Sequence, residues 1–230
     1  LNSMDNFYYH QWDTDDERNG YISRMINESD GSDYYTNSNT VDAINPPLFG
    51  WAEWEQYQIH GDVERFTQVI RGKPIIDRLD AYFQFIKTNR THKSDPMAGL
   101  YVSNGQGNGL DNTPNQDWGG WGQAANDMSL QQVQAADYIV KICREIVEKD
   151  PNLTDEERTK YTAMAEKYEE ERDDLKALIQ NKLWSESGSF FFNANADSGE
   201  LTNIATPTGL WALAAGVATE EQAEAIAAST

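Results

Sequence analysis

The segment with the clearest chemical potential runs from residue 105 to residue 121 and reads GQGNGLDNTPNQDWGGW. It contains two carboxylates, Asp111 and Asp117, several side-chain amides, and the indole rings of Trp118 and Trp121. Glycine and proline are too frequent in it for a helix or a paired strand. Polar groups that alternate with flat aromatic faces suit a sugar ring, which has hydroxyl edges and C–H faces. The alternative is a surface loop whose Asp and Asn side chains form turns and helix caps.

The overall composition limits the kinds of partner. The chain has 230 residues and a formal net charge of −20. This excess of carboxylates argues against binding to a nucleic acid backbone or an anionic membrane, because both require Lys and Arg to replace counterions. No segment approaches the run of roughly 20 apolar residues that membrane insertion requires. A neutral carbohydrate partner remains compatible, and we expect no cofactor.

Residues that could bind a metal or act as a nucleophile are scattered along the chain. His10, His60 and His92 lack the spacing of metal ligands, so we predict no metal site. The acidic residues at 13–16 could hold calcium, but a solvated charge run is the favoured interpretation. Cys143 is the only cysteine, and its place on an apolar helical face indicates a buried, inert thiol.

The pattern of apolar residues predicts an all-α chain with little strand. Apolar residues in the segment 127–148 recur at alternating steps of three and four, which is typical of one face of an amphipathic helix. Thr154 and Glu157 form a capping-box pattern that begins the next helix. The predicted elements are a helix at 46–60 that begins with two prolines and ends at Gly61, a kinked helical arm at 62–89 with Asp62 as N-cap, a long loop at 90–126, helices at 127–148 and 154–183, a small β-hairpin near 189–204, a short helix at 206–217, and a last helix from 219.

Successive helical hairpins joined by long decorated loops favour a helical toroid, with the loops gathered at one end. A solenoid would need a fixed repeat, and the sequence has none. We interpret residues 1–230 as a single domain that closes only part of the ring. The opening residues and the unfinished last helix lead us to expect a fragment truncated at both ends.

Two strings of the sequence resemble motifs of glycoside hydrolase family 63 and related enzymes, which include the trehalases and the mannosylglycerate hydrolases. NPPLFGWAEW at residues 45–54, followed by Gly61 and Asp62, resembles their "PP-x-x-x-W-A-x-W … G-D" helix. GLDNTP at 109–114 resembles their "S-G-L/M-D-N-S/T-P" loop. The resemblance implies an (α/α)6 toroid with the site in its mouth, and inverting hydrolysis.

Weaker matches extend the resemblance over most of the chain. They are GYISR at 20–24, the Asp127-led helix start at 127–131, the segment 183–192, and GLW with AAG at 209–216. The sequence departs from the family motif at two places, which bear on the substrate more than on the chemistry. The residues after Pro114 lack the family's usual Arg. Before Gly109, Gly107 and Asn108 replace an acidic or small residue and a serine.

The resemblance implies a role for Asp111 as general acid. An inverting enzyme also needs an opposed carboxylate as general base, roughly 6.5–9.5 Å away. In the family this glutamate lies near the end of the toroid, so we expect it beyond residue 230 and predict that residues 1–230 alone are inactive. Asp117 is a possible neighbour that raises the pKa of Asp111, or a simple loop acceptor.

Substrate contacts are expected from several further side chains. Trp51 and Trp118 are candidate stacking platforms, and Arg24, Asn45, Asn112 and Asp127 are candidates for contacts to sugar hydroxyls. Glu53, Asp117 and Trp211 complete the predicted set. Each has an alternative: a tryptophan can fill the toroid core, Arg24 can pair with an acid, Glu53 can lie on the helix surface, and Asp127 can be an N-cap.

The sequence therefore predicts an inverting hydrolase of α-linked glucosides or mannosides, acting on an oligosaccharide or a disaccharide. The rival hypothesis is a non-catalytic carbohydrate-binding module that keeps the aromatic platform. A toroidal epimerase or lyase is disfavoured, since no histidine lies in the acid-bearing loop. The resemblance favours a periplasmic or secreted location over a cytoplasmic one, and the oligomeric state is left open.

Overall fold

A computed structural model of the chain describes residues 3–33, 44–103, 109–110, 112–114 and 121–229. Its helices are α1 (Ser3–His10), α2 (Phe49–His60), α3 (Glu64–Thr67), α4 (Ile75–Asn89), α5 (Asn126–Lys149), α6 (Asp155–Leu183), α7 (Pro207–Ala214) and α8 (Glu220–Ser229). Its strands are β1 (Val69–Ile70), β2 (Lys73–Pro74), β3 (Gln123–Ala124), β4 (Trp184–Ser185), β5 (Phe190–Phe191) and β6 (Ala194–Asn195). The strands form three antiparallel pairs, β1 with β2, β3 with β6 and β4 with β5.

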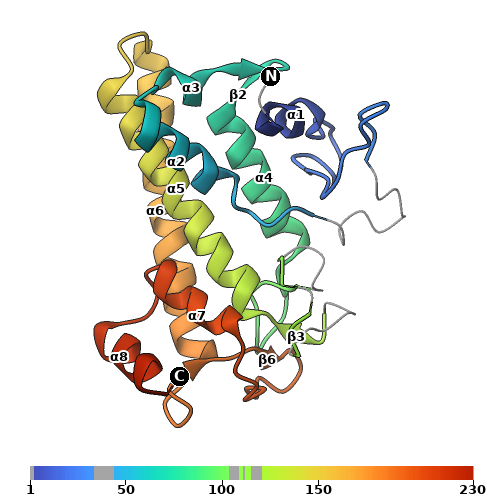
Figure 1. Cartoon of the computed structure of the whole chain (residues 1–230), viewed down its shortest axis with the longest axis vertical. Helices are drawn as coiled ribbons and strands as arrows, with labels where there is room; N and C mark the ends of the chain where they lie inside the picture. Colours follow the sequence, from blue (N-terminus) through green and yellow to red (C-terminus); the bar gives the residue numbers. More distant parts are fainter. Residues whose placement is uncertain (1–2, 34–43, 104–108, 111, 115–120, 230) are drawn as a thin grey trace.

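The centre of the fold is the antiparallel pair of long helices α5 and α6 (Figure 1). The apolar stripe of α5 is buried as its periodicity predicts, including Val133, Val140 and the Cys143 thiol. The capping box at the start of α6 is confirmed: the Glu157 amide donates to Thr154 Oγ1 at 3.2 Å, and the Thr154 amide donates to Glu157 Oε2 at 2.9 Å.

Five of the described helices lie in two layers. α2 runs parallel to α5, since Gly50 packs on Tyr138 and the Tyr57 hydroxyl donates to Glu145 at 2.8 Å. α7 lies against the other half of α5, where Trp211 meets Gln134 (Figure 1). We call α2, α5 and α7 the first layer.

The second layer consists of α4 and α6. Lys160 binds Asp77 at 2.6 Å and Lys87 binds Glu171 at 2.9 Å, so α4 and α6 run in the same direction. Because α6 is antiparallel to α5, the two layers alternate in direction, as consecutive helix pairs of a toroid do. The chain thus forms part of a helical toroid, as the sequence predicted.

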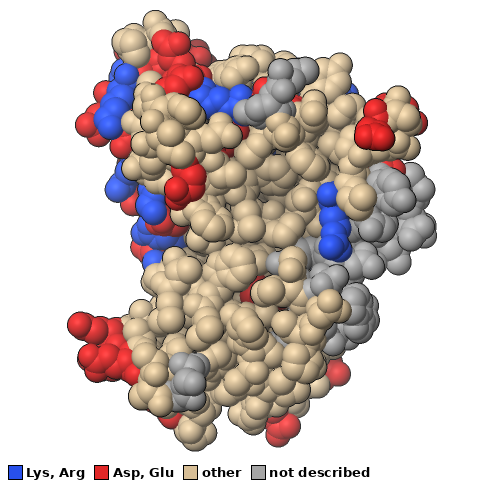
Figure 2. Space-filling view, viewed as in Figure 1, with Lys and Arg blue, Asp and Glu red and all other residues tan. Residues whose placement is uncertain are grey.

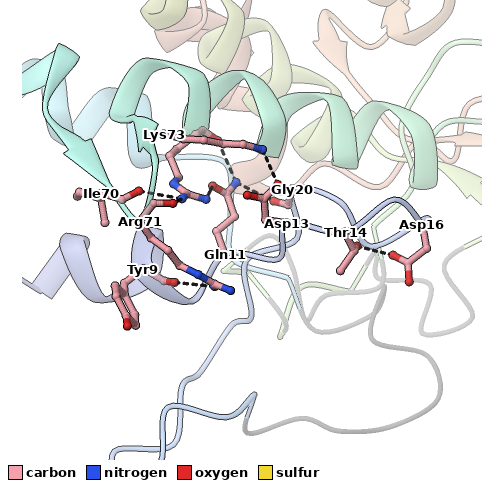
Figure 3. A network of polar contacts seen from close by, with 10 residues as sticks. Tyr9, Gln11, Asp13, Thr14, Asp16, Gly20, Ile70, Arg71 and Lys73 are labelled. Atoms are coloured by element: carbon pink, nitrogen blue, oxygen red, sulfur yellow. Dashed lines mark hydrogen bonds and ion pairs between the residues drawn. The ribbon is translucent and has the colours of Figure 1, made fainter.

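A polar network ties the segment after α1 to the start of α4 (Figure 3). Gln11 Nε2 donates to the carbonyl oxygens of Gly20, at 2.9 Å, and Arg78, at 3.0 Å. The buried guanidinium of Arg78 in turn donates to the carbonyl oxygens of Ile70 and Arg71. Gly20 has φ +86°, and a Cβ there would lie 2.1 Å from a carbonyl oxygen of α4, so only glycine allows this close approach.

Two of the acidic residues at 13–16, Asp13 and Asp16, are engaged within the protein. Asp13 binds Lys73 at 2.6 Å (Figure 3). Asp16 accepts hydrogen bonds from the Thr14 hydroxyl and the Arg18 amide, and these bonds lower the pKa of its carboxyl group. Among the described residues, no cluster of His, Cys, Asp and Glu could hold a metal ion.

Three local predictions were wrong in detail. The arm at 62–89 is two helices separated by the β1–β2 hairpin, because Arg71 and Gly72 adopt positive φ and Pro74 cannot donate within a helix. Val63, and not Asp62, is the N-cap of α3. The two prolines at 46–47 precede α2, which begins at Phe49.

The β-hairpin near 189–204 is present with different pairing. Its turn is confirmed, since Ala194 bridges Leu201 and the Asn195 amide donates to the Glu200 carbonyl at 2.8 Å. The phenylalanines of β5, however, pair with β4 directly before them. The short connection makes this the nearer partner, and it leaves β6 to pair with β3.

Candidate functional site

Three of the strings that resemble family motifs meet at the N-terminal end of α2. Ser23 forms a β-bridge with Ile44, and Asn45 Nδ2 donates to the Ser23 carbonyl at 2.5 Å. The Tyr82 hydroxyl donates to the Asn45 carbonyl and fixes this junction to α4. Gly109 lies beside Pro46, since a Cβ on Gly109 would be 3.7 Å from Pro46 Cγ. The segments 20–24, 45–54 and 109–110 are therefore neighbours, and the half-buried side chain of Arg24 belongs to this group.

A second group of strings meets at the N-terminal end of α5. Asn126 Nδ2 donates to the Phe191 carbonyl, and the Asn126 amide donates to Asn193 Oδ1, both at 2.9 Å. Gly209 packs on the same carbonyl, since a Cβ there would lie 2.4 Å from the Phe191 oxygen. The segments 183–192 and 209–216 are thus joined to the start of α5.

Asp127 is buried at this junction, with 2% of its surface exposed. It is not the N-cap of α5, because Ala125 has that position and provides no side-chain cap. Its carboxylate accepts from the Met128 amide at 2.6 Å, within the first helical turn, where the helix dipole stabilises negative charge. The predicted contact of Asp127 with a sugar hydroxyl stays a prediction.

Between the two groups, the first layer presents three aromatic rings, one from each helix. Trp51 on α2 is 40% exposed, while Tyr138 on α5 and Trp211 on α7 are half-buried. We call these three residues the aromatic row. Partial exposure shows that neither tryptophan is enclosed in the core of the described chain.

Glu53 lies on the opposite side of α2 and is fully buried. Both of its oxygens bind Arg65, at 2.8 and 3.0 Å, and Arg65 also binds Asp5 at 2.7 Å. Burial, and next the Glu53 charge, raise the pKa of the neighbouring Tyr8 well above its ordinary value. This cluster joins α1, α2 and α3, and a sugar contact from Glu53 would have to displace Arg65.

The acid-bearing loop is only partly among the described residues. Asp111, Asp117 and Trp118 lie outside them. Asn112 is described and exposed, and the Thr113 hydroxyl donates to the Leu110 carbonyl at 3.0 Å.

Sequence reasoning missed Tyr138 and Gln134. They occupy positions four residues apart on α5, on the face opposite its buried stripe. The signal was an aromatic and an amide at helical spacing among polar neighbours, which is also the ordinary appearance of a solvated helix face.

The charges of the molecule avoid the exposed face of the first layer. In Figure 2 the middle of this face has few charged side chains, whereas Lys, Arg, Asp and Glu gather along the edge where α6 lies. For a chain with a net charge of −20, this is a strong segregation. None of the described helices is both long and apolar enough to cross a membrane.

The chain belongs to the family of mannosylglycerate hydrolase MGH1-like glycoside hydrolase domains, whose model matches residues 3–230. This confirms the predicted relationship to mannosylglycerate hydrolases, while membership of family 63 itself stays a prediction. No curated protein matches the chain significantly.

Several solved structures are similar to the chain, among them the following two. An uncharacterized conserved protein from Thermus thermophilus aligns over 97% of this chain with a TM-score of 0.58 and 16% identity. A neutral trehalase from Saccharomyces cerevisiae aligns over 54% of this chain with a TM-score of 0.42 and 23% identity. The chain spans 66% of the first protein and 22% of the second. The first likeness shows a shared fold.

Proposed function

We propose that the protein containing this chain is an inverting glycoside hydrolase that acts on α-linked glucosides or mannosides. The observation that carries the proposal is the convergence of motif strings. Members of this family hydrolyse glycosidic bonds, and here the segments 20–24, 45–54 and 109–110 are in contact at one end of α2.

Asp111 is the proposed general acid, which donates a proton to the leaving glycosidic oxygen. A carboxyl group that acts as an acid near neutral pH needs a pKa raised by burial or by a second carboxylate. Asp117 is the proposed neighbour. The general base, which deprotonates the attacking water, is proposed to lie beyond residue 230, so residues 1–230 alone would hydrolyse little or nothing.

Sugar binding is proposed to use both groups of strings. Trp51, Trp118 and Trp211 would stack on sugar rings, and the polar side chains would bind hydroxyl groups. Those polar side chains are Arg24, Asn45, Glu53, Asn112, Asp117 and Asp127. Among them Glu53 has the least support, because both of its oxygens already bind Arg65.

The test is Asp111→Asn in the full-length protein, assayed with a panel of α-linked glucosides and mannosides. We expect hydrolysis to fall by at least about 10²-fold, since a general acid typically contributes that much, while equilibrium binding changes little. Asp173→Asn is the matched control, because it makes the same carboxylate-to-amide change on an exposed side chain of α6 outside the candidate site. Retained turnover in Asp111→Asn contradicts the assignment, and sugar binding without any wild-type hydrolysis favours the non-catalytic module.

A further inference from the structure

We infer that the aromatic row is a stacking platform for a neutral oligosaccharide of three or more sugar units, with Gln134 and Glu55 as positioning residues. The inference rests on the proposed function and specifies its substrate. Trp51 and Trp211 were predicted as separate contacts from the sequence, whereas Tyr138 connects them in the structure.

The row is continuous across the three helices of the first layer. Tyr138 packs against Gly50, the residue before Trp51. One helical turn away on α5, Gln134 accepts a hydrogen bond from Trp211. Because α5 lies between α2 and α7, the row crosses two interhelical spacings of about 8–10 Å each. A platform of that extent is longer than one sugar ring.

Hydrogen bonds fix the two indole rings at the ends of the row. Trp51 Nε1 donates to Glu55 Oε1 at 3.0 Å, and Trp211 Nε1 donates to Gln134 Oε1 at 2.9 Å. With its N–H group engaged, each ring has a favoured orientation, and its flat face is left for contacts with other groups. This satisfies the polar edge of each indole before any ligand binds.

The central ring is held by its own neighbours. The Lys141 ammonium lies 4.9 Å from the centre of the Tyr138 ring and binds Asp137 at 2.7 Å. Burial raises the pKa of the Tyr138 hydroxyl, the charge of Lys141 lowers it, and the carboxylate of Glu55 raises it. Tyr138 is thus neutral at physiological pH and can bind sugar hydroxyl groups as donor and acceptor.

The charge pattern selects a neutral ligand. The face of the first layer has few charges (Figure 2), and two of those beside the row are the carboxylates of Glu55 and Asp137. Asp137 binds Lys141 at 2.7 Å and Arg172 at 3.0 Å, so its charge is offset. A glycoside with its own carboxylate would be repelled by Glu55 and by the net charge of the molecule.

The row is also continuous with the candidate catalytic end. Trp51 is in the first turn of α2, and Pro46, which contacts Gly109, lies just before that helix. A chain bound along the row would therefore reach the loop that bears Asp111. Phe49 and Leu48 line an apolar groove of about 260 Å³ at this junction.

The test measures calorimetric binding to the full-length protein of neutral α-linked glucose and mannose tetrasaccharides, of the corresponding disaccharides, and of a glyceric-acid glycoside as the charged comparison. For Tyr138→Ala we expect a loss of about three- to tenfold in tetrasaccharide affinity, as for removal of one aromatic contact, and a smaller loss for the disaccharide. Tyr138→Phe should restore most of the affinity. Tyr9→Ala, which removes an exposed ring outside the row, is the control and should change neither affinity.

The role of Glu55 as a positioning residue is tested by comparing two substitutions of it. Glu55→Gln keeps an acceptor for Trp51 and should bind the tetrasaccharide like the wild type, whereas Glu55→Leu should lose about threefold. A thermal unfolding midpoint for each variant shows that it is folded.

Three results would overturn the platform: equal losses for both sugar lengths, tighter binding of a glyceric-acid glycoside than of the neutral tetrasaccharide, or a lowered unfolding midpoint with no change in affinity. The last result would mean that further helices of the toroid cover the row. The outcomes are separable from the proposed function, because Asp111→Asn is read from turnover and the Tyr138 variants are read from equilibrium binding.

Discussion

The helices α5 and α6 lie side by side, yet they differ in how much of their surface other helices cover. α5 has 24 residues and is packed by α6 on one side and by α2, α4 and α7 on others, so most of its surface is enclosed. α6 has 29 residues and keeps a broad charged face towards solvent. The difference shows that position in the layers, more than helix-forming tendency, decides which side chains a helix of this fold can carry.

The same contrast holds for acidic residues. Glu53 in the first layer is fully buried and bound at both oxygens by Arg65. Glu169 on α6 binds Arg144 at 2.5 Å, but the Arg144 side chain is 63% exposed. One carboxylate therefore depends on its partner for solvation, and the other has water as an alternative.

Replacing Glu53 by Ala should have the largest effect on stability. The substitution leaves Arg65, whose side chain is 12% exposed, with only Asp5 as a charged partner, and breaking a buried pair costs about 3–5 kcal/mol. We expect a decrease of this size in the free energy of unfolding, measured by urea denaturation. The control Glu169→Ala should cost at most about 1 kcal/mol, and equal costs for the two variants would refute the contrast.

Truncating the enclosed helix should have the next largest effect. Ile142 on α5 is completely buried, so Ile142→Ala leaves a cavity and should cost about 2–5 kcal/mol. Ile59 on α2 is 76% exposed, and Ile59→Ala should change the free energy of unfolding by no more than about 0.5 kcal/mol. Unfolding in urea with an unchanged m-value measures both. A cost below about 1 kcal/mol for Ile142→Ala would mean that α5 is not enclosed in solution.

The layers could be predicted from local signals only where those signals were strong. The stripe containing Val133 and Cys143 and the capping box at Thr154 predicted α5 and α6 almost to the residue. The pairing of β5 could not be predicted, because each strand is two residues long and its partner is chosen by connection length and packing. The role of Gly20, which allows the chain to approach α4 closely, could not be predicted, because the contact joins residues far apart in the sequence.

The candidate site likewise has features that the sequence predicted and features that it did not. The strings at 45–54 and 109–114 predicted a shared location, and the contact between Gly109 and Pro46 agrees with it. The row through Tyr138 could not be predicted, since it depends on the relative height of α2 and α5. Glu53 illustrates the converse: its position two residues after Trp51 suggested the same surface, but two residues of a helix turn the side chain by about 200°, to the opposite side.

Removing the cap of α6 should have a moderate effect. Thr154→Ala deletes the hydroxyl that accepts from the Glu157 amide, and loss of an N-cap typically costs about 1 kcal/mol. Thr159→Ala, whose hydroxyl donates to the Asp155 carbonyl within α6, is the control and should cost less. An unchanged unfolding midpoint in Thr154→Ala would show that α6 begins without this cap in solution.

The same cap should make stability depend on acid pH. Hydrogen bonds from the Thr154 amide, and then from its hydroxyl, lower the pKa of Glu157. A lowered pKa in the folded state means that the stabilisation is present above the unfolded pKa of about 4.3 and is lost as pH falls through the folded pKa. Glu157→Gln keeps a capping side chain that does not titrate, so its stability should fall less than that of the wild type on acidification. Parallel acid dependence of the two proteins would contradict this.

The smallest effect should come from the ion pair between α4 and α6. Lys160 and Asp77 are 44% and 23% exposed, so Asp77→Asn should cost about 0.2–1 kcal/mol at low ionic strength. In 1 M salt the screening length is about 3 Å, and the cost should largely disappear. The cost of Glu53→Ala should persist in the same salt, because its pair is buried. Unfolding both variants at low and high salt therefore tests the contrast between the layers directly: a cost of Asp77→Asn that survives screening would place its carboxylate in the same class as Glu53.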